Sequence, residues 1–294
     1  MKQFIHSGYI ATTIKGNSMR YVLIATLCCC MIGMNGCDII TPPYKKNSVV
    51  TPPDTSKVFK KAVLEEFTGH NCQNCPDKGH IPAKQLKALY GDRFIAIAYH
   101  VSSFAEPSKR YPPDYRTPTG NEIFYIAREP GLPSGIVNRL EVNGQMAQSS
   151  DSWGTVVQQE LATEAEVKLE LTPQFNEQTK LATFTVKITL LEDAQEPLYL
   201  ALYMLEDSIV SPQNVMGVRD TMYVHKDMFR GAINSTYGDQ VFDMGKKKGE
   251  VVTKTYTFAM DKVTWRPEHC SAVAIVHVNA PAYEILQAEE VKLK

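Results

Sequence analysis

The sequence predicts two folded domains, an α/β domain followed by an all-β antiparallel sandwich. Residues 58–100 read as strand, turn, helix and strand, with two cysteines at the turn. From residue 166 onward, apolar and polar residues alternate in several runs, which is the period of half-buried strands. The 294-residue chain leaves 258 residues after its first 36, enough for two domains of roughly 100–150 residues each.

Residues 1–36 have the pattern of a bacterial lipoprotein signal peptide. They contain three basic residues and no acidic one, and YVLIATLCCCMI is an apolar run too short to span a bilayer. The following Met34–Cys37 resembles a lipobox, so we expect cleavage before Cys37 and diacylglycerol on that cysteine. An ordinary secretory signal, in which Cys37 has no special role, is the alternative. Met19 would begin a more compact signal and is the expected true start.

Composition limits the classes of partner. The formal net charge is −1, and removing the three basic residues of the signal makes it −4, so no nucleic-acid partner is expected. Residues 37–57 form the lipidated N-terminus and a tether with two Thr-Pro-Pro repeats. A proline-rich tether of this length reaches roughly 60 Å at about 3.1 Å per residue.

Cysteine usage excludes a disulfide framework. Of seven cysteines, three lie in the signal and Cys37 is the lipid acceptor, which leaves Cys72, Cys75 and Cys270. Small secreted domains that depend on disulfides carry more of them. Ordinary hydrophobic cores must therefore stabilise both domains.

The first domain, residues 58–165, contains a Cys-Gln-Asn-Cys motif in a redox context. A strand is predicted over 58–67, a helix at least over 82–90 with Gly91 as its C-cap, and a second strand over 94–100. Strand, CxxC, helix and strand is the order in which this motif indicates redox chemistry, and here the sequence resembles thioredoxin-like proteins. Residues 131–137, GLPSGIV, resemble the element in which that family holds a cis-proline beside its active site, which corresponds to Pro133.

The resemblance implies roles for four residues. Cys72, at the start of a helix, is the expected nucleophile because exposed N–H groups favour its thiolate, and Cys75 is the expected resolving cysteine. Glu66 matches the buried carboxylate of thioredoxins and is a candidate proton relay. A charge at a strand end is the alternative, and the sequence does not decide whether Glu66 or Glu65 points inward. Pro133 would shape the backbone that docks substrate.

Departures from the thioredoxin pattern leave the redox direction open. Asn71 precedes the first cysteine, Gln-Asn separates the pair, and Pro76 follows it directly. The pair is therefore a reductant, an oxidant or a structural disulfide. Residues 102–120, rich in Pro and Tyr, are either a lip for a partner or a surface loop.

Metal binding is the competing interpretation of the same segment. His70, Cys72, Cys75 and His80 supply four zinc-type ligands, but structural zinc sites usually take their two ligand pairs from more widely separated turns. Attachment of c-type haem would need histidine directly after Cys75, where Pro76 stands. We expect no metal and no cofactor.

The second domain, residues 166–294, is predicted as an immunoglobulin-like sandwich. A helix from about Ser152, with Trp153 on its core face, closes the first domain, and six period-two runs follow. Residues 223–241 form a long predicted loop in which His225, Lys226 and Arg230 cluster, either to bind an acidic ligand or as a solvated face. Cys270 and His277 lie in an apolar strand and are predicted core residues.

Taken whole, the chain is similar to a family of outer-membrane lipoproteins of Bacteroidetes, named for a mass of twenty-eight kilodaltons and known as surface antigens. The residues that carry the likeness are LEEFTGHNCQNCP, GLPSGIVNR and YVHKDMFRGAINSTYGD. The resemblance implies a lipid-anchored protein of the cell outer membrane, and it leaves open whether the protein faces the periplasm or the cell surface.

Two functional classes remain open. The first is a thiol–disulfide oxidoreductase acting on exported or surface proteins, and the second is a non-catalytic surface binding or adhesion protein that uses the α/β domain as a scaffold. Expected partners are the membrane, through lipid on Cys37, and a protein thiol or disulfide. Oligomeric state is left open.

Overall fold

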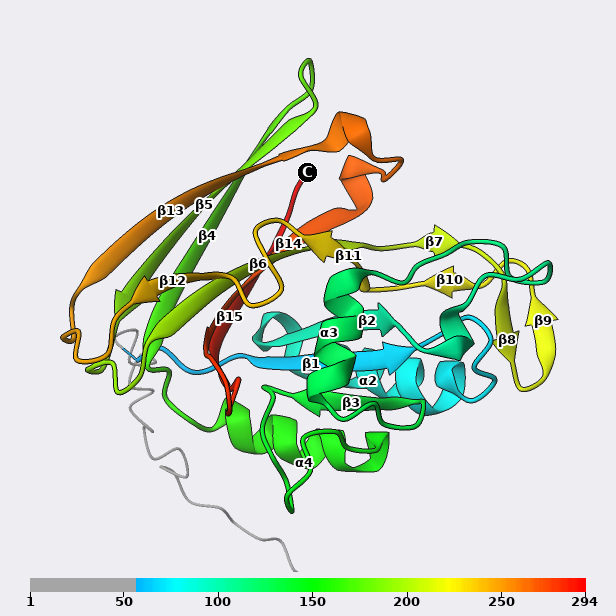
Figure 1. Cartoon of the computed structure of the whole chain (residues 1–294), viewed down its shortest axis with the longest axis horizontal. Helices are drawn as coiled ribbons and strands as arrows, with labels where there is room; N and C mark the ends of the chain where they lie inside the picture. Colours follow the sequence, from blue (N-terminus) through cyan, green and yellow to red (C-terminus); the bar gives the residue numbers. More distant parts are fainter. Residues whose placement is uncertain (1–56) are drawn as a thin grey trace, which may run out of the picture. The chain divides into compact units, whose positions relative to one another are not determined.

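Two buried parallel strands form the centre of the fold (Figure 1). In the computed structural model, which describes residues 57–294, β1 (Ala62–Thr68) pairs in parallel with β2 (Phe94–His100). Helix α2 (Ile81–Tyr90) lies in the crossover between them, as parallel strands require. All seven residues of β2 are buried. Such a run is typical of a strand covered on both faces.

Helices cover both faces of these strands. Helices α2 and α4 (Ser150–Leu161) pack on one face around Trp153, which is fully buried. Helix α3 (Pro118–Ile126) packs on the other face through Ile123 and its neighbour. Helix α3 was not predicted, because its first residues belong to the proline-rich segment that reads as a loop.

A short strand, β3 (Ser134–Val137), pairs with the other edge of β1 in the antiparallel direction. Its Gly135 is required by packing. A Cβ at this position would lie 2.9 Å from Leu64 Cδ1 and 3.0 Å from Trp153 Cζ2, so a side chain would overlap the core.

The central sheet continues from β2 into the C-terminal half of the chain. Strand β11 pairs in parallel with β2, where Met228 lies opposite Ala98, and in antiparallel fashion with β6. The result is one eight-stranded mixed sheet in the order β15-β14-β6-β11-β2-β1-β3, with β12 also paired to β6. The added strands are β6 (Leu198–Glu206), β11 (Met228–Ala232), β12 (Asp239–Phe242), β14 (Cys270–Val278) and β15 (Ile285–Lys292).

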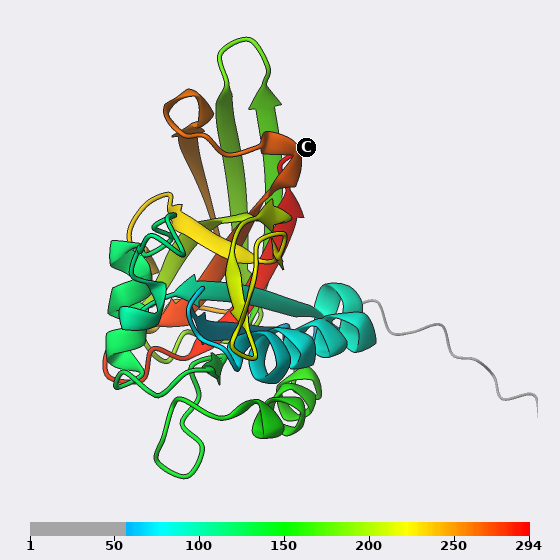
Figure 2. The ribbon, with the colours of Figure 1, turned by 90° about the vertical axis from the view of Figure 1, so that its right-hand side faces the viewer.

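A second, three-stranded antiparallel sheet packs against the β6 and β14 end of the large sheet (Figures 1 and 2). Alternate residues of its central strand are fully buried and enter a core shared with β6 and β14, as the period-two pattern predicts. Cys270 and His277 of β14 are fully buried, so their prediction as core residues is confirmed. The sheet has the order β13-β5-β4 and consists of β4 (Val167–Asn176), β5 (Leu181–Leu190) and β13 (Val251–Ala259).

The predicted fold class, an α/β thioredoxin-like domain followed by a separate immunoglobulin-like sandwich, is wrong. The described chain is mostly β, with three α-helices, and residues on both sides of the predicted boundary at 165/166 share one mixed sheet. The physical cause is β11. This strand pairs with the free edge of β2 on one side and with the free edge of β6 on the other, which joins the two halves into a continuous sheet.

A fully buried ion pair crosses this core. Arg139 Nε and Nη2 donate to the two carboxylate oxygens of Glu65 at 2.7 and 2.8 Å, and the side chains of both residues are completely inaccessible. The Tyr99 hydroxyl donates to the same carboxylate at 2.9 Å. A buried charge persists only when it is paired and hydrogen-bonded in this way.

Several predictions fall outside the described residues. The signal peptide, the start at Met19, the lipid acceptor Cys37 and nearly all of the 37–57 tether precede residue 57 and stay predictions. Among residues 57–294, no helix has both the length and the apolar character needed to cross a membrane.

Candidate functional site

Cys72 and Cys75 lie directly after β1 and are joined by a disulfide. The backbone turns there because the Cys72 amide donates to the Gly69 carbonyl at 3.0 Å. Cys75 caps one π-helical turn (Pro76–His80), which runs without interruption into α2. Proline is accepted at this start because the first N–H groups of a helix have no partner within the helix. Both cysteines are buried, with 3% and 2% of their surface exposed.

The structure brings the other two predicted residues to the same place. Gly79, in the turn after Cys75, lies between Glu66 of β1 and Pro133, which precedes β3. A Cβ on Gly79 would collide with Glu66 Oε1 and lie 3.1 Å from Pro133 Cβ. The peptide bond before Pro133 is cis. Glu66 and Pro133 therefore lie against the helical turn that directly follows the disulfide, although the residues come from three separate segments.

The two adjacent glutamates of β1 point to opposite faces of the sheet, as successive strand residues must. Glu65 is bound by Arg139, whereas Glu66 lines a small cavity together with Cys75. Burial, with a smaller effect from the carboxylate of Asp227, raises the pKa of Glu66 to about 8. Glu66 is therefore largely protonated at neutral pH, so its carboxyl group can donate a proton.

A small polar cavity of about 20 Å³ lies beside Cys75. This volume has room for about one water molecule. Its polar lining includes Glu66, Cys75, His80, His100 and His225. The cavity therefore places Cys75 next to groups that can exchange protons.

Imidazoles form an unusual buried cluster beside this cavity. The ring of His100 lies 5.4 Å from that of His225 and 6.4 Å from that of His70, measured between centroids. Burial lowers the pKa of all three, that of His225 to about 4, so the rings are neutral at pH 7. His100 is only 4% exposed, and both of its ring nitrogens are buried without a hydrogen-bond partner.

A short hairpin lies across the cysteine turn. It is formed by β8 (Gln213–Val215) and β9 (Val218–Asp220) and extends the ribbon of β7 (Ile209–Val210) and β10 (Val224–His225). The Gln213 side-chain amide donates to the carbonyl of Cys72 at 3.1 Å. These strands lie partly within the loop predicted over residues 223–241 and partly before it.

The tyrosine-rich segment 102–120 packs beside the histidines. Tyr111 stacks on the ring of His70 at 5.3 Å, and Tyr115 contacts His100 edge-on at the same centroid distance. Whether this segment also receives a partner stays a prediction.

The predicted basic cluster of His225, Lys226 and Arg230 does not form a shared anion site. His225 belongs to the buried imidazole cluster, Lys226 pairs with Asp207 at 3.2 Å, and Arg230 pairs with Glu206 at 3.4 Å. Each charge therefore has its own partner.

The zinc interpretation finds no preformed ligand set. The two sulfurs are bonded to one another, and His70 Nε2 donates to the Glu106 carbonyl at 3.0 Å. Within residues 57–294, no group of three or more His, Cys, Asp or Glu side chains is arranged to hold a metal ion.

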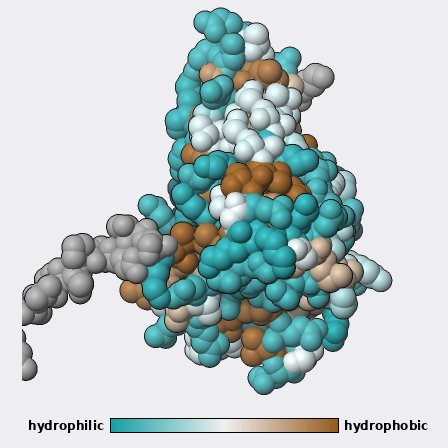
Figure 3. All heavy atoms as spheres, turned by 90° about the vertical axis from the view of Figure 1, so that its left-hand side faces the viewer, coloured by the Kyte–Doolittle hydropathy of each residue, from teal (hydrophilic) through white to brown (hydrophobic). Residues whose placement is uncertain are grey.

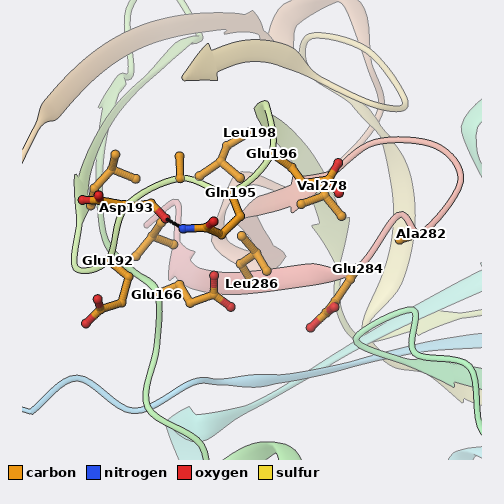
Figure 4. Close-up of a pocket in the computed structure, with 13 residues that line it drawn as sticks. Glu166, Glu192, Asp193, Gln195, Glu196, Leu198, Val278, Ala282, Glu284 and Leu286 are labelled. Atoms are coloured by element: carbon orange, nitrogen blue, oxygen red, sulfur yellow. Dashed lines mark hydrogen bonds between the residues drawn. The ribbon is translucent and has the colours of Figure 1, made fainter. Parts of the chain in front are cut away.

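An acidic pocket of about 200 Å³ lies at the end of the molecule away from the cysteines (Figure 4). Its carboxylates lie apart from one another, and three of them are neutralised by lysines. Asp193 pairs with Lys247 at 2.9 Å, Glu192 pairs with Lys248 at 3.1 Å, and Glu284 pairs with Lys60 at 3.0 Å. Figure 3 shows that this end is mainly hydrophilic, with apolar areas of limited extent.

Sequence reasoning missed His100, Gln213 and Tyr223, which all line the cavity. His100 ends a correctly predicted strand, and a histidine at a strand end has no distinctive pattern. Gln213 follows Ser211-Pro212, a common turn signal, and nothing local connects it to Cys72.

The structure thus has a mostly β fold with one large mixed sheet, in which a bonded CxxC pair lies near a buried, protonated carboxyl. The chain belongs to the family described as outer membrane protein Omp28, whose model matches residues 126–294. The predicted family is confirmed, and so is the predicted location of a lipid-anchored protein in the cell outer membrane. The acceptor of the lipid, Cys37, stays a prediction.

Two solved structures from Porphyromonas gingivalis are similar to this chain. HBP35 is 21% identical with a TM-score of 0.62, and the match covers 80% of this chain and 76% of that one. A domain of the outer membrane lipoprotein Omp28 is 21% identical with a TM-score of 0.31, covering 44% of this chain and 89% of that one. The likeness to HBP35 shows the fold alone. No curated protein matches the chain.

Proposed function

We propose that this outer-membrane protein carries out thiol–disulfide exchange on exported or surface proteins at Cys72 and Cys75. The observation that carries the proposal is the bonded pair with the protonated Glu66 carboxyl in the cavity behind it. Pro133 lies on the other side of the same turn. Perturbed acids beside reactive groups are typical of functional sites.

The reaction can be written from the oxidised state. A thiolate of a substrate dithiol attacks Cys72 Sγ, forms a mixed disulfide, and breaks the Cys72–Cys75 bond. Cys75 leaves as a thiolate and takes a proton. The second substrate thiol, once deprotonated, attacks the substrate sulfur of the mixed disulfide and releases Cys72. Two electrons and two protons pass from the substrate dithiol to the protein, and the reverse sequence reduces a substrate disulfide.

Glu66 is the proposed proton donor to Cys75. Both residues line the same cavity, and burial keeps the carboxyl protonated at neutral pH because its pKa is raised to about 8. A proton held there stabilises the leaving sulfur as it separates from Cys72. In the reverse direction the carboxylate accepts the proton of the Cys75 thiol.

A purely structural role explains this disulfide less well. A disulfide stabilises a fold more as the loop it closes becomes longer. Cys72 and Cys75 are only three positions apart, so the bond closes a short loop and removes less conformational entropy from the unfolded chain than a long-range disulfide would.

The alternative is a surface binding protein in which the pair takes no part. The burial of both sulfurs favours it, because a buried disulfide does not react with a macromolecule. The two functions make opposite predictions for the chemistry of the pair.

The test is an insulin-reduction assay with a dithiol as electron donor, together with a reduction potential measured in a dithiol redox buffer. The Cys72→Ala variant is expected to fall to the uncatalysed rate. Cys270→Ala is the matched control, because Cys270 is a free, buried thiol in β14 and its loss leaves the pair intact. Equal activity in the two variants, or a pair that the dithiol does not reduce, would favour the binding protein.

A further inference from the structure

The β8–β9 hairpin is held on the cysteine turn mainly by hydrogen bonds. The backbone amide of Asn214 donates to the His70 carbonyl at 2.8 Å, and that of Met216 donates to the Gln73 carbonyl at 3.0 Å. The Gln213 side-chain amide adds bonds to the carbonyls of Gly69 and Cys72 at 3.3 and 3.1 Å. A strand of this hairpin therefore pairs with the turn that carries both sulfurs.

Little apolar burial supports these bonds. Gln213 is 2% exposed, but Met216 and Val218 at the tip are 61% and 69% exposed, and Met222 after β9 is 70% exposed. Segments held by polar contacts with few buried apolar groups open locally at low free-energy cost. The hairpin is thus a part of the fold that can leave its place while the sheet stays intact.

The closed hairpin is incompatible with exchange on a macromolecule. Exchange requires an attacking sulfur to reach a sulfur of the disulfide directly. Cys72 and Cys75 are 3% and 2% exposed, and Gln213 lines the cavity beside Cys75. A polypeptide can reach the pair only after a covering element moves.

We infer that the β8–β9 hairpin is a displaceable cover, and that it occupies the place where an extended segment of a partner polypeptide pairs with the backbone of residues 70–73. The inference rests on the proposed exchange function and names the kind of partner that this function needs.

The chemistry of the turn determines that partner. When the hairpin leaves, the carbonyls of His70, Asn71, Cys72 and Gln73 lose donors, since Asn71 also accepts from Asn214 Nδ2 at 3.3 Å. An extended peptide supplies backbone N–H groups at regular spacing to such acceptors, as in strand addition to an exposed edge. The partner is therefore an unfolded or extended segment that carries cysteine near these amides.

The first experiment measures access to the sulfurs by the rate at which a small phosphine reduces the native disulfide. One variant is Gln213→Ala, and a second replaces residues 213–220 by Gly-Ser-Gly. The short link can close because the Ser211 amide donates to the Tyr223 carbonyl at 3.0 Å, which holds the ends together. Gln240→Ala in β12 is the control, because that side chain bonds only to nearby surface groups.

Reduction is expected to be about tenfold faster in Gln213→Ala than in the wild type, and faster still without the hairpin. Each hydrogen bond lost from the closed state shifts the opening equilibrium roughly two- to tenfold, and two bonds across the turn are removed. The control is expected to match the wild type. Equal rates in all four proteins would overturn the inference.

The second experiment traps the partner. A linear peptide with one activated cysteine is reacted with reduced Cys75→Ser, alone and in combination with the hairpin replacement. The mixed disulfide on Cys72 is expected to form faster without the hairpin, and more slowly with a peptide whose amides beside the cysteine are N-methylated.

The outcomes separate the two levels of the proposal. Faster phosphine reduction without formation of a mixed disulfide would support the hairpin as a displaceable cover, but it would overturn both the exchange function and the partner site. Trapping that does not respond to N-methylation would overturn backbone pairing while leaving the exchange function standing.

Discussion

Replacing Glu66 with glutamine removes a carboxyl that the fold keeps protonated. Burial raises its pKa from 4.5 to about 8. Between pH 4.5 and about pH 8, the native state therefore holds a proton that the unfolded chain has released. The free energy of unfolding consequently falls as the pH rises through this range. At 1.36 kcal/mol per pKa unit the difference is about 5 kcal/mol. Glutamine resembles the protonated acid and does not ionise, so the variant is expected to lose this dependence.

The measurement is urea unfolding of the oxidised wild type and Glu66→Gln at pH 5 and at pH 8.5. The two proteins are expected to have similar stability at pH 5, and the variant is expected to be more stable at pH 8.5 by several kcal/mol. Glu65→Gln is the matched control at the neighbouring position. It is expected to be less stable than the wild type at both pH values, because it weakens the buried pair with Arg139. An identical pH slope in wild type and Glu66→Gln would refute the assignment of Glu66 as a protonated acid.

Two further predictions concern other buried charges. Arg139→Met leaves Glu65 buried without its partner and is expected to lower the free energy of unfolding by about 3–5 kcal/mol; a loss under about 1 kcal/mol in urea unfolding would contradict the assigned ion pair. Burial lowers the pKa of His225 to about 4, so the ring is buried in its neutral form. The stability that it contributes is complete above pH 6.5 and falls by about 3 kcal/mol as the pH drops toward 4. In His225→Phe the difference in stability between pH 7 and pH 4.5 is expected to shrink accordingly, and an unchanged difference would count against a buried neutral ring.

Local patterns identified most of the regular elements. The predicted strand over 94–100 coincides with β2, and the helix expected from about Ser152 is α4, which begins at Ser150. The period-two runs after residue 166 all form strands. Such features depend on neighbours within one element, where side-chain periodicity and capping act directly.

Pairing between distant segments was not predictable in the same way. Strand β11 lies in a segment with glycine, asparagine and charged residues, and only its partners β2 and β6 make it a strand. The single-sheet architecture followed from that pairing. Likewise, the sequence could not choose between Glu65 and Glu66, because the choice depends on which face of β1 meets α2 and which meets the C-terminal half of the sheet.

The sequence by itself determined the chemical groups of the site, which are two cysteines after a strand, a carboxyl before them and a proline elsewhere in the chain, and it predicted an N-terminal segment of lipoprotein type. Only the tertiary structure decided that the carboxyl is buried and protonated, that histidines from β2 and β10 line the cavity beside Cys75, and that both sulfurs are buried. The physical reason is that burial and pairing are properties of surfaces brought together from distant positions, whereas residue type and spacing are written along the chain.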